Sequence, residues 1–345
     1  MFVTIKMALT GVACPDAGKI ACVWVDVRLL LIDNNMKNFL KYVSVFSASL
    51  ILLIIGVEYM LRQVPNALAF KKELIEKHTQ DTKNLIIGSS VVNCGINPAY
   101  LADSTYNLAI SGEWFRFNQI LLEKYIQQMP QLKNVFWGIC FHSLWSDDNE
   151  NTDISSIVNH QIYMGISRNH NKLHNIELLS LGSLCMRKWS KYYIQRRPTM
   201  RCDSLGVDHS YDSKFKDNNW LEDIPELVAD QHKPMLADTN GDLYRENISR
   251  MHQIAQVCKS KGITLYLVMP PVHPTYFQLM NQEQLTLIHN AITEVTNKWE
   301  NVHSLEYFGD TRFNNEDFYD GNHLSSDIGA IKFTKILKDD ILTDL

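Results

Sequence analysis

Short apolar segments alternate with longer amphipathic segments along most of this chain, from residue 84 to residue 342. Each apolar segment is hydrophobic on both faces, as a strand is in a parallel sheet covered by helices on either side. We therefore predict an α/β fold, a three-layer sandwich built on a five-stranded parallel sheet. The predicted strands are Asn84–Ile87, Thr105–Ala109, Asn134–Ile139, Thr264–Met269 and Val302–Leu305, and the predicted helices are Phe115–Gln128, Leu243–Lys261, Gln282–Glu300 and Ser325–Leu342.

The alternation stops between Ser146 and Asp238, where His, Asn, Tyr and charged residues are frequent. Such a stretch is too long for a plain loop, so we predict a mostly helical insertion at 146–238 within a domain at 63–345. The insertion leaves the carboxyl end of the third predicted strand, which is the edge where such sheets bind ligands. We therefore expect it to lie over the ligand site.

An uncharged and strongly apolar run extends from Tyr42 to Val57. With its flanks it is long enough to cross a bilayer, and we predict a transmembrane helix at 40–62. Lys37 and Lys41 precede the run, which favours a cytoplasmic amino terminus and an extracytoplasmic domain.

Two other interpretations of the apolar run stay open. The first is a buried core helix. The second is a signal peptide, and Ala67-Leu-Ala69 resembles a cleavage site some ten residues beyond the run. Residues 1–35 carry no clear pattern, and Met36 resembles a true start. We expect residues 1–35 to be poorly ordered or to be a start-site extension.

The net charge of -5 gives no reason to expect nucleic-acid binding, which usually needs a basic surface. The seven cysteines form no C-x-x-C pair, so neither a disulfide framework nor a zinc site is indicated, although Cys185 and Cys202 remain a possible pair outside the cytoplasm. No metal or organic cofactor is expected. One basic, aromatic run at 187–197 is unusual in an acidic chain. It is either a solvated helix face or a surface for anionic glycans or phospholipid head groups.

Two polar motifs lie at strand and helix ends in the way that a nucleophile and its base require. Gly88-Ser-Ser90 follows the first predicted strand, and Asp320-Gly-Asn-His323 opens the last predicted helix. A serine needs an imidazole to take its proton, and the imidazole needs a carboxylate to hold its tautomer. If the fold joins these motifs, Ser90, His323 and Asp320 form a catalytic triad. Ser89 is the rival nucleophile.

These motifs resemble those of the SGNH/GDSL hydrolase superfamily. Ser90 matches the nucleophile of the first block, Gly112 matches the glycine of the second, and Asp320-x-x-His323 matches the last. The resemblance implies a flavodoxin-like sheet and an oxyanion hole formed by the N–H groups of Ser90 and Gly112.

The third block departs from the family pattern. The family places an asparagine after the third strand, as a further oxyanion donor, whereas this chain has Gly138-Ile-Cys-Phe-His142-Ser143. Either His142 or Ser143 replaces the asparagine, or the site uses only backbone donors. Losing one oxyanion donor typically costs about 10²–10³ in turnover.

The resemblance, together with the apolar run, implies a membrane-anchored serine esterase or O-acyltransferase of the inner membrane. Its substrate would be an acylated carbohydrate or cell-envelope glycan, with envelope-assembly proteins as possible partners. One alternative is a catalytically silent glycan-binding protein of the same fold, which the missing asparagine favours. The other is a cytosolic esterase. Further residues expected near the substrate are Ser89, Trp114, His142, Ser143, His273, Tyr276 and Asn322, although His142, His273, Tyr276 and Trp114 also fit structural roles.

Overall fold

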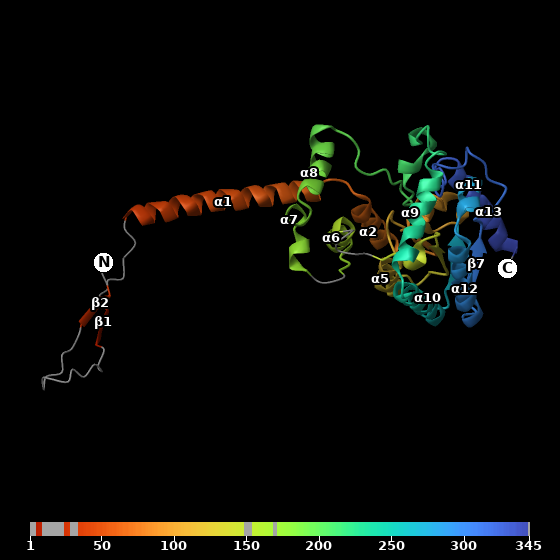
Figure 1. Cartoon of the computed structure of the whole chain (residues 1–345), viewed down its shortest axis with the longest axis horizontal. Helices are drawn as coiled ribbons and strands as arrows, with labels where there is room; N and C mark the ends of the chain where they lie inside the picture. The colour runs from red at the N-terminus through yellow and green to blue at the C-terminus, as the bar shows by residue number, and fades with distance from the viewer. Residues whose placement is uncertain (1–4, 9–23, 28–33, 148–153, 168–170, 344–345) are drawn as a thin grey trace. The chain divides into compact units, whose positions relative to one another are not determined.

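The computed structural model describes residues 5–8, 24–27, 34–147, 154–167 and 171–343, and the chain divides into two compact units, Met1–Tyr59 and Met60–Leu345 (Figure 1). In the first unit, β1 (Ile5–Ala8) pairs antiparallel with β2 (Trp24–Val27). The sequence pattern does not predict these two strands. Asn34 and Asn35 are helical, as the start of the next helix, and the expectation of poor order for residues 1–4, 9–23 and 28–33 concerns residues outside the described ones.

The helix α1 (Asn34–Arg62) begins six residues before the predicted span and ends where predicted. Its stretch from Met36 to Arg62 has a mean hydropathy of 2.1 in its most apolar window, and none of that window is buried. The helix is therefore long and apolar enough to span a membrane, and its exposure does not fit a buried core helix.

The second unit is built on five parallel strands, which confirms the predicted α/β class. Their spatial order is β4-β3-β5-β6-β7, which is 2-1-3-4-5 in chain order and therefore flavodoxin-like. The strands are β3 (Asn84–Ile87), β4 (Thr105–Asn107), β5 (Asn134–Gly138), β6 (Thr264–Met269) and β7 (Val302–Glu306). In this topology ligands bind beyond the carboxyl ends of β3 and β5, where the order of the strands reverses.

Helices cover both faces of the sheet, as neighbouring residues of β5 show. Trp137 packs on Phe115 and donates its indole N–H to Asn118, on the face covered by α5 (Phe115–Tyr125). Phe136 points to the opposite face, because successive side chains alternate along a strand. On the first face α10 (Asp242–Ser260) packs against α5 and α12 (Gln282–Lys298), and elsewhere α4 (Pro98–Leu101) packs against α13 (Gly329–Thr343).

The segment between β5 and β6 is mostly helical, as predicted, but it consists of short pieces. They include α6 (Ile154–Asn159), α7 (Glu177–Leu181), α8 (Ser183–Trp189), the π-helical turn η5 (Ser190–Ile194) and α9 (Ile224–Ala237). The limits proposed for the domain and its insertion stay predictions.

Several predicted element bounds differ from the structure by one to four residues; for example, α5 ends at Tyr125 and not at Gln128. Two of the differences coincide with side-chain hydrogen bonds. The strand β4 ends at Asn107, whose side chain accepts the N–H of Ala109, while the N–H groups of Leu108 and Ile110 still donate to the carbonyls of Ile86 and Gly88. The last helix begins at Gly329 and not at Ser325, because the Ser325 hydroxyl accepts the N–H of Gly329 and caps the helix from outside.

Candidate active site

Ser90 lies at the sharp turn from β3 into the short helix α3 (Ser90–Asn93). Gly88 has a φ of +138°, a region in which residues with a Cβ are rarely found. Val92 of α3 packs on Gly88 and on Gly138 of β5, and a Cβ on Gly138 would lie 2.5 Å from the Val92 Cγ2. The two glycines therefore let the helix that carries Ser90 approach the strand ends closely.

His323 and Asp320 lie in one tight turn, and the structure brings both to Ser90. The Asp320 carboxylate accepts the backbone N–H groups of Asn322 and His323 and lies 2.9 Å from His323 Nδ1. His323 Nε2 lies 2.7 Å from Ser90 Oγ. Burial by itself raises the pKa of Asp320, but His323 and the two N–H groups hold it below its usual value. In such an arrangement an imidazole can take the proton of a serine hydroxyl while a carboxylate orients the ring.

The backbone N–H groups of Ser90 and Gly112 have no hydrogen-bond acceptor among the described residues. Gly112 is exposed, has a φ of +78°, and has open space where a Cβ would stand. Unpaired donors beside the nucleophile are what an acyl-transfer oxyanion requires. The two N–H groups are therefore available for the oxyanion hole that the resemblance implies.

Lys71 supports the segment that leads to Gly112, directly at Ala109 and through Asn93 at Ser111. It lies on α2 (Ala67–His78), is fully buried, and donates to the Asn93 carboxamide oxygen at 2.5 Å and to the carbonyl of Ala109. Asn93 in turn donates to the Ser111 hydroxyl at 3.1 Å. Burial lowers the pKa of the Lys71 ammonium group. Sequence reasoning missed this lysine, because a buried Lys has no pattern that separates it from the basic residues around it.

The insertion reaches the site through Tyr211. Its ring centroid lies 5.0 Å from that of His323 and 5.1 Å from that of Tyr319, and its hydroxyl lies 3.3 Å from Ser111 Oγ. Tyr211 therefore bridges the histidine turn and the segment of Gly112. The sequence predicts that the insertion covers this edge of the sheet, but nothing in it singles out Tyr211.

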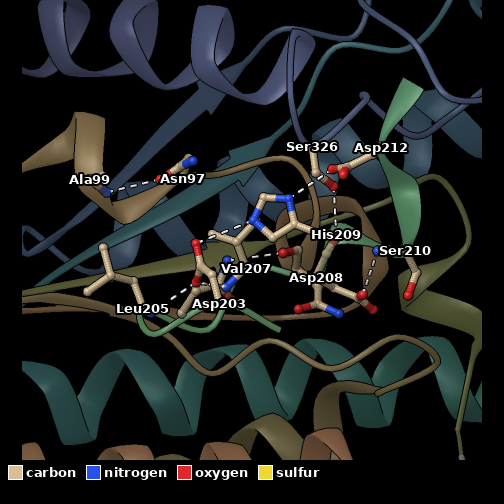
Figure 2. A network of polar contacts seen from close by, with 12 residues as sticks. Asn97, Ala99, Asp203, Leu205, Val207, Asp208, His209, Ser210, Asp212 and Ser326 are labelled. Atoms are coloured by element: carbon tan, nitrogen blue, oxygen red, sulfur yellow. Dashed lines mark hydrogen bonds and ion pairs between the residues drawn. The ribbon is translucent and has the colours of Figure 1, made fainter. Parts of the chain in front are cut away.

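The strap, residues 202–213, is hydrogen-bonded both to the Ser90 segment and to the His323 segment. Figure 2 shows its internal polar contacts and its contact with Ser326. Its Asp208 N–H donates to the carbonyl of Asn93, and its Asp208 carbonyl accepts the Ser326 hydroxyl at 2.7 Å. Within the strap His209 lies between two carboxylates, 2.8 Å from Asp212 and 3.5 Å from Asp203. Burial alone lowers the pKa of His209, but these carboxylates raise it above its usual value.

After the third strand of the sheet, where the resemblance would place an asparagine, the structure has a cluster around the Cys140 thiol. The sulfur lies 2.9 Å from Ser143 Oγ, 3.7 Å from His142 Nδ1 and 3.9 Å from Ser89 Oγ. Burial raises the pKa of this thiol, but the His142 imidazole and the neighbouring hydroxyls lower it to about 6. His142 also meets Trp114 edge-on at 5.3 Å. His142, Ser143 and Ser89 thus contact Cys140, a residue that the sequence reasoning did not single out.

The other predicted pocket residues support the histidine turn. His273 is buried, and its Nδ1 accepts the N–H of Thr275 and so caps α11 (Pro274–Leu279). Its Nε2 lies 2.8 Å from Asn315 Oδ1. Its backbone N–H donates to the carbonyl of Gly321. Tyr276 is buried and lies where a Cβ on Gly321 would touch its ring at 3.2 Å. Asn322 is buried, and its N–H binds Asp320.

No family model matches the sequence, and no curated protein matches it. Among solved structures, a protein from Streptococcus pneumonia that is provisionally described as a platelet activating factor aligns with 85% of this chain and 99% of its own chain. The two are 14% identical in sequence, with a TM-score of 0.40. The fold assignment accordingly rests on the strand order and register of the sheet, and the candidate site rests on its own geometry.

Proposed function

We propose that this protein is a membrane-anchored serine esterase or O-acyltransferase of the SGNH type that acts on an acylated carbohydrate of the cell envelope. One observation carries the proposal: Ser90 Oγ lies 2.7 Å from His323 Nε2, and His323 Nδ1 lies 2.9 Å from the Asp320 carboxylate. Both distances lie within hydrogen-bonding reach, which proton transfer requires.

In the proposed reaction Ser90 Oγ attacks the acyl carbonyl carbon while His323 Nε2 takes the hydroxyl proton. Asp320 holds the ring and stabilises the imidazolium. The oxyanion of the tetrahedral intermediate accepts the N–H groups of Ser90 and Gly112. When the intermediate collapses, the carbohydrate oxygen leaves with the proton from His323, and the acyl group stays on Ser90. Water or a second hydroxyl then attacks the acyl-serine by the same steps, which gives hydrolysis or transfer.

The surroundings of Ser90 support a carbohydrate substrate. Trp114, Tyr211 and Tyr319 are partly exposed, and each lies close to a residue of the candidate site. Partly exposed aromatic rings offer an apolar face together with a polar group, which suits a sugar ring. The helix α1, which is long and apolar enough to span a membrane, supports a location in the inner membrane with the domain outside the cytoplasm. Envelope-assembly proteins are the proposed partners.

A fluorophosphonate probe tests the nucleophile directly, because it phosphonylates an activated serine. We expect the full-length protein in detergent to be labelled, and the Ser90→Ala and His323→Ala variants to lose the label. Ser89→Ala is the matched control and should still be labelled, since the Ser89 hydroxyl contacts Cys140 and not His323. Labelling that survives Ser90→Ala, or its absence from the wild type, would contradict the enzymatic proposal. An unlabelled wild type would favour the glycan-binding alternative.

A further inference from the structure

Residues 183–201 form a basic segment in an acidic protein. The whole chain has a formal charge of -5, yet this segment contains six basic residues and no Asp or Glu. The six are Arg187, Lys188, Lys191, Arg196, Arg197 and Arg201. The segment comprises α8, η5 and the residues that follow them. We call residues 183–201 the basic segment.

Most of these charges are free to meet an external partner. Arg187, Lys191, Arg196 and Arg197 are exposed, and none of the four faces a carboxylate at ion-pair distance within the described part of the chain. Lys188 differs, because it binds Glu177 at 2.6 Å. Unpaired cations in a cluster repel one another, so the cluster favours an anionic partner.

Apolar and aromatic side chains are interspersed among these cations. Ile194 is 65% exposed, and Leu184 is 40% exposed. The segment also holds Trp189, Tyr192 and Tyr193, which pack against one another. Trp and Tyr are enriched where lipid head groups meet the acyl region, and exposed Leu or Ile beside Lys or Arg is typical of helices that lie in that interface.

The basic segment and its neighbours bind the chain at the point where the candidate span ends. The Tyr193 hydroxyl donates to the carbonyl of Met60 at 3.0 Å, and the Thr199 hydroxyl donates to the carbonyl of Pro65 at 2.6 Å. Next to the segment, the Arg62 guanidinium donates to the carbonyl of Asn175 at 2.6 Å. If α1 spans a bilayer, these contacts hold the basic segment at the height of the lipid head groups.

We propose that the basic segment is a second membrane contact, which binds the head groups of anionic phospholipids and buries Ile194 and Leu184 at the interface. Continuity with the end of the span favours a lipid surface over a free glycan, because the span brings the segment to the lipid. The inference rests on the membrane anchor of the proposed function but not on its chemistry. A domain held at two points cannot turn freely about its tether, so this contact would fix the direction in which the site faces.

Hydrogen–deuterium exchange on the full-length protein in lipid nanodiscs tests this contact. We expect peptides from 183–201 to exchange roughly fivefold more slowly in discs of phosphatidylcholine with phosphatidylglycerol than in discs of phosphatidylcholine alone, since each basic residue near an anionic surface contributes about 1 kcal/mol. The difference should disappear at high salt. The double variant Arg196→Glu, Arg197→Glu should abolish it.

The matched control is Lys335→Glu, Lys338→Glu, which changes the charge equally on α13, at the opposite edge of the domain from α8 (Figure 1). This control should keep the phosphatidylglycerol effect. Equal exchange in the two discs, or an effect that survives reversal of Arg196 and Arg197, would overturn the inference. Peptides from 36–62 report on the anchor separately. If those peptides are protected while 183–201 is not, the second contact fails and the anchor stands.

Discussion

At the scale of single residues, Ser89 and Ser90 are adjacent hydroxyls in different surroundings. Ser90 is partly exposed, with its Oγ 2.7 Å from His323 Nε2. Ser89 is buried, and its Oγ contacts the Cys140 sulfur at 3.9 Å. A serine becomes a strong nucleophile only when a base takes its proton, so we expect the reaction at Ser90. The surroundings, and not the residue type, separate the two serines.

Asp320→Asn should leave the turn folded but remove the charge that stabilises the imidazolium. A carboxamide at this position also favours the wrong tautomer of His323. We expect ester turnover to fall by about 10³–10⁴-fold with little change in KM. Steady-state kinetics with an aryl ester measures this. Asp310→Asn, which removes a carboxylate paired with Arg312 away from the site, should keep normal turnover. Equal turnover of Asp320→Asn and the wild type would refute the assigned role of Asp320.

Lys71→Met tests whether the buried lysine positions the Gly112 segment. The change leaves the acceptors on Asn93 and Ala109 without their donor, which costs about 1–3 kcal/mol for each buried group. The segment of Gly112 then loses the contacts that position its N–H group. We expect kcat to fall by about 10²-fold or more, as it does when an oxyanion donor is removed, while KM changes little.

The control for Lys71→Met is Leu74→Ala, a change at a buried residue of the same helix that makes a cavity. Both variants should unfold at lower denaturant concentration, but only Lys71→Met should lower kcat in the folded protein. If the two variants lower kcat equally, Lys71 has only a structural role.

At the scale of elements, strands were easier to predict than the ends of helices. The bounds of β3 and β6 agree with the prediction, because each strand is almost entirely apolar or aromatic after its first residue. The end of β4 and the start of α13 coincide with hydrogen bonds from backbone N–H groups to the side chains of Asn107 and Ser325. Either residue type is compatible with continuing the element or ending it, so tertiary context decides.

The candidate site was only partly predictable for a related reason. Ser90, Gly112, Asp320 and His323 stand at ends of strands or in a loop before a helix, and parallel strands bring such ends to one edge. Cys140 and Tyr211 carry no comparable signal. Tyr211 reaches His323 through the path of an insertion, and the low pKa of the Cys140 thiol comes from an imidazole and hydroxyls that the fold brings to it.

Gly138→Ala tests the close packing of α3 on the sheet. The new Cβ would lie 2.5 Å from Val92 Cγ2, so α3 must shift and carry Ser90 with it. We expect a loss of about 1–3 kcal/mol in the free energy of unfolding and slower fluorophosphonate labelling. Val92→Ala removes the clashing methyl groups, so the double variant should recover part of both losses. Strictly additive effects in urea titrations and labelling rates would contradict this packing account.

At the scale of the whole molecule, the Ser90 and His323 segments are 233 positions apart, and the strap is one of the connections between them. The strap donates to the carbonyl of Asn93, three residues after Ser90, and accepts the hydroxyl of Ser326, three residues after His323. Figure 2 shows the contact with Ser326. The strap also accepts the N–H of Asn107 at the end of β4, through the carbonyl of Leu205. Loosening of the strap should therefore affect the stability of the domain and the geometry of the site together.

The stability of the strap should depend on pH through His209. The groups that face its ring are Asp203 and Asp212, and Lys214 lies 3.2 Å from Asp212. Burial alone lowers the pKa of His209, but the two carboxylates raise it above its usual value in the folded state. A raised folded pKa means that charged His209 stabilises the fold fully below the unfolded pKa of about 6.5. This contribution is lost as the pH rises through the folded pKa.

His209→Gln keeps a hydrogen-bonding side chain but removes the titration, so the comparison with the wild type isolates this effect. We expect the wild type to melt at a higher temperature than His209→Gln near pH 6, and this difference in melting temperature to disappear as the pH rises through the raised folded pKa. The surface pair His289 and Glu306 provides the matched control, because His289→Gln removes a more exposed histidine–carboxylate contact of 2.9 Å. Surface pairs contribute little, so its melting gap should be small at every pH. Thermal unfolding of the detergent-solubilised full chain across this pH range measures both gaps. A gap for His209→Gln that is constant with pH, or that widens as the pH rises, would show that the imidazolium does not hold the strap.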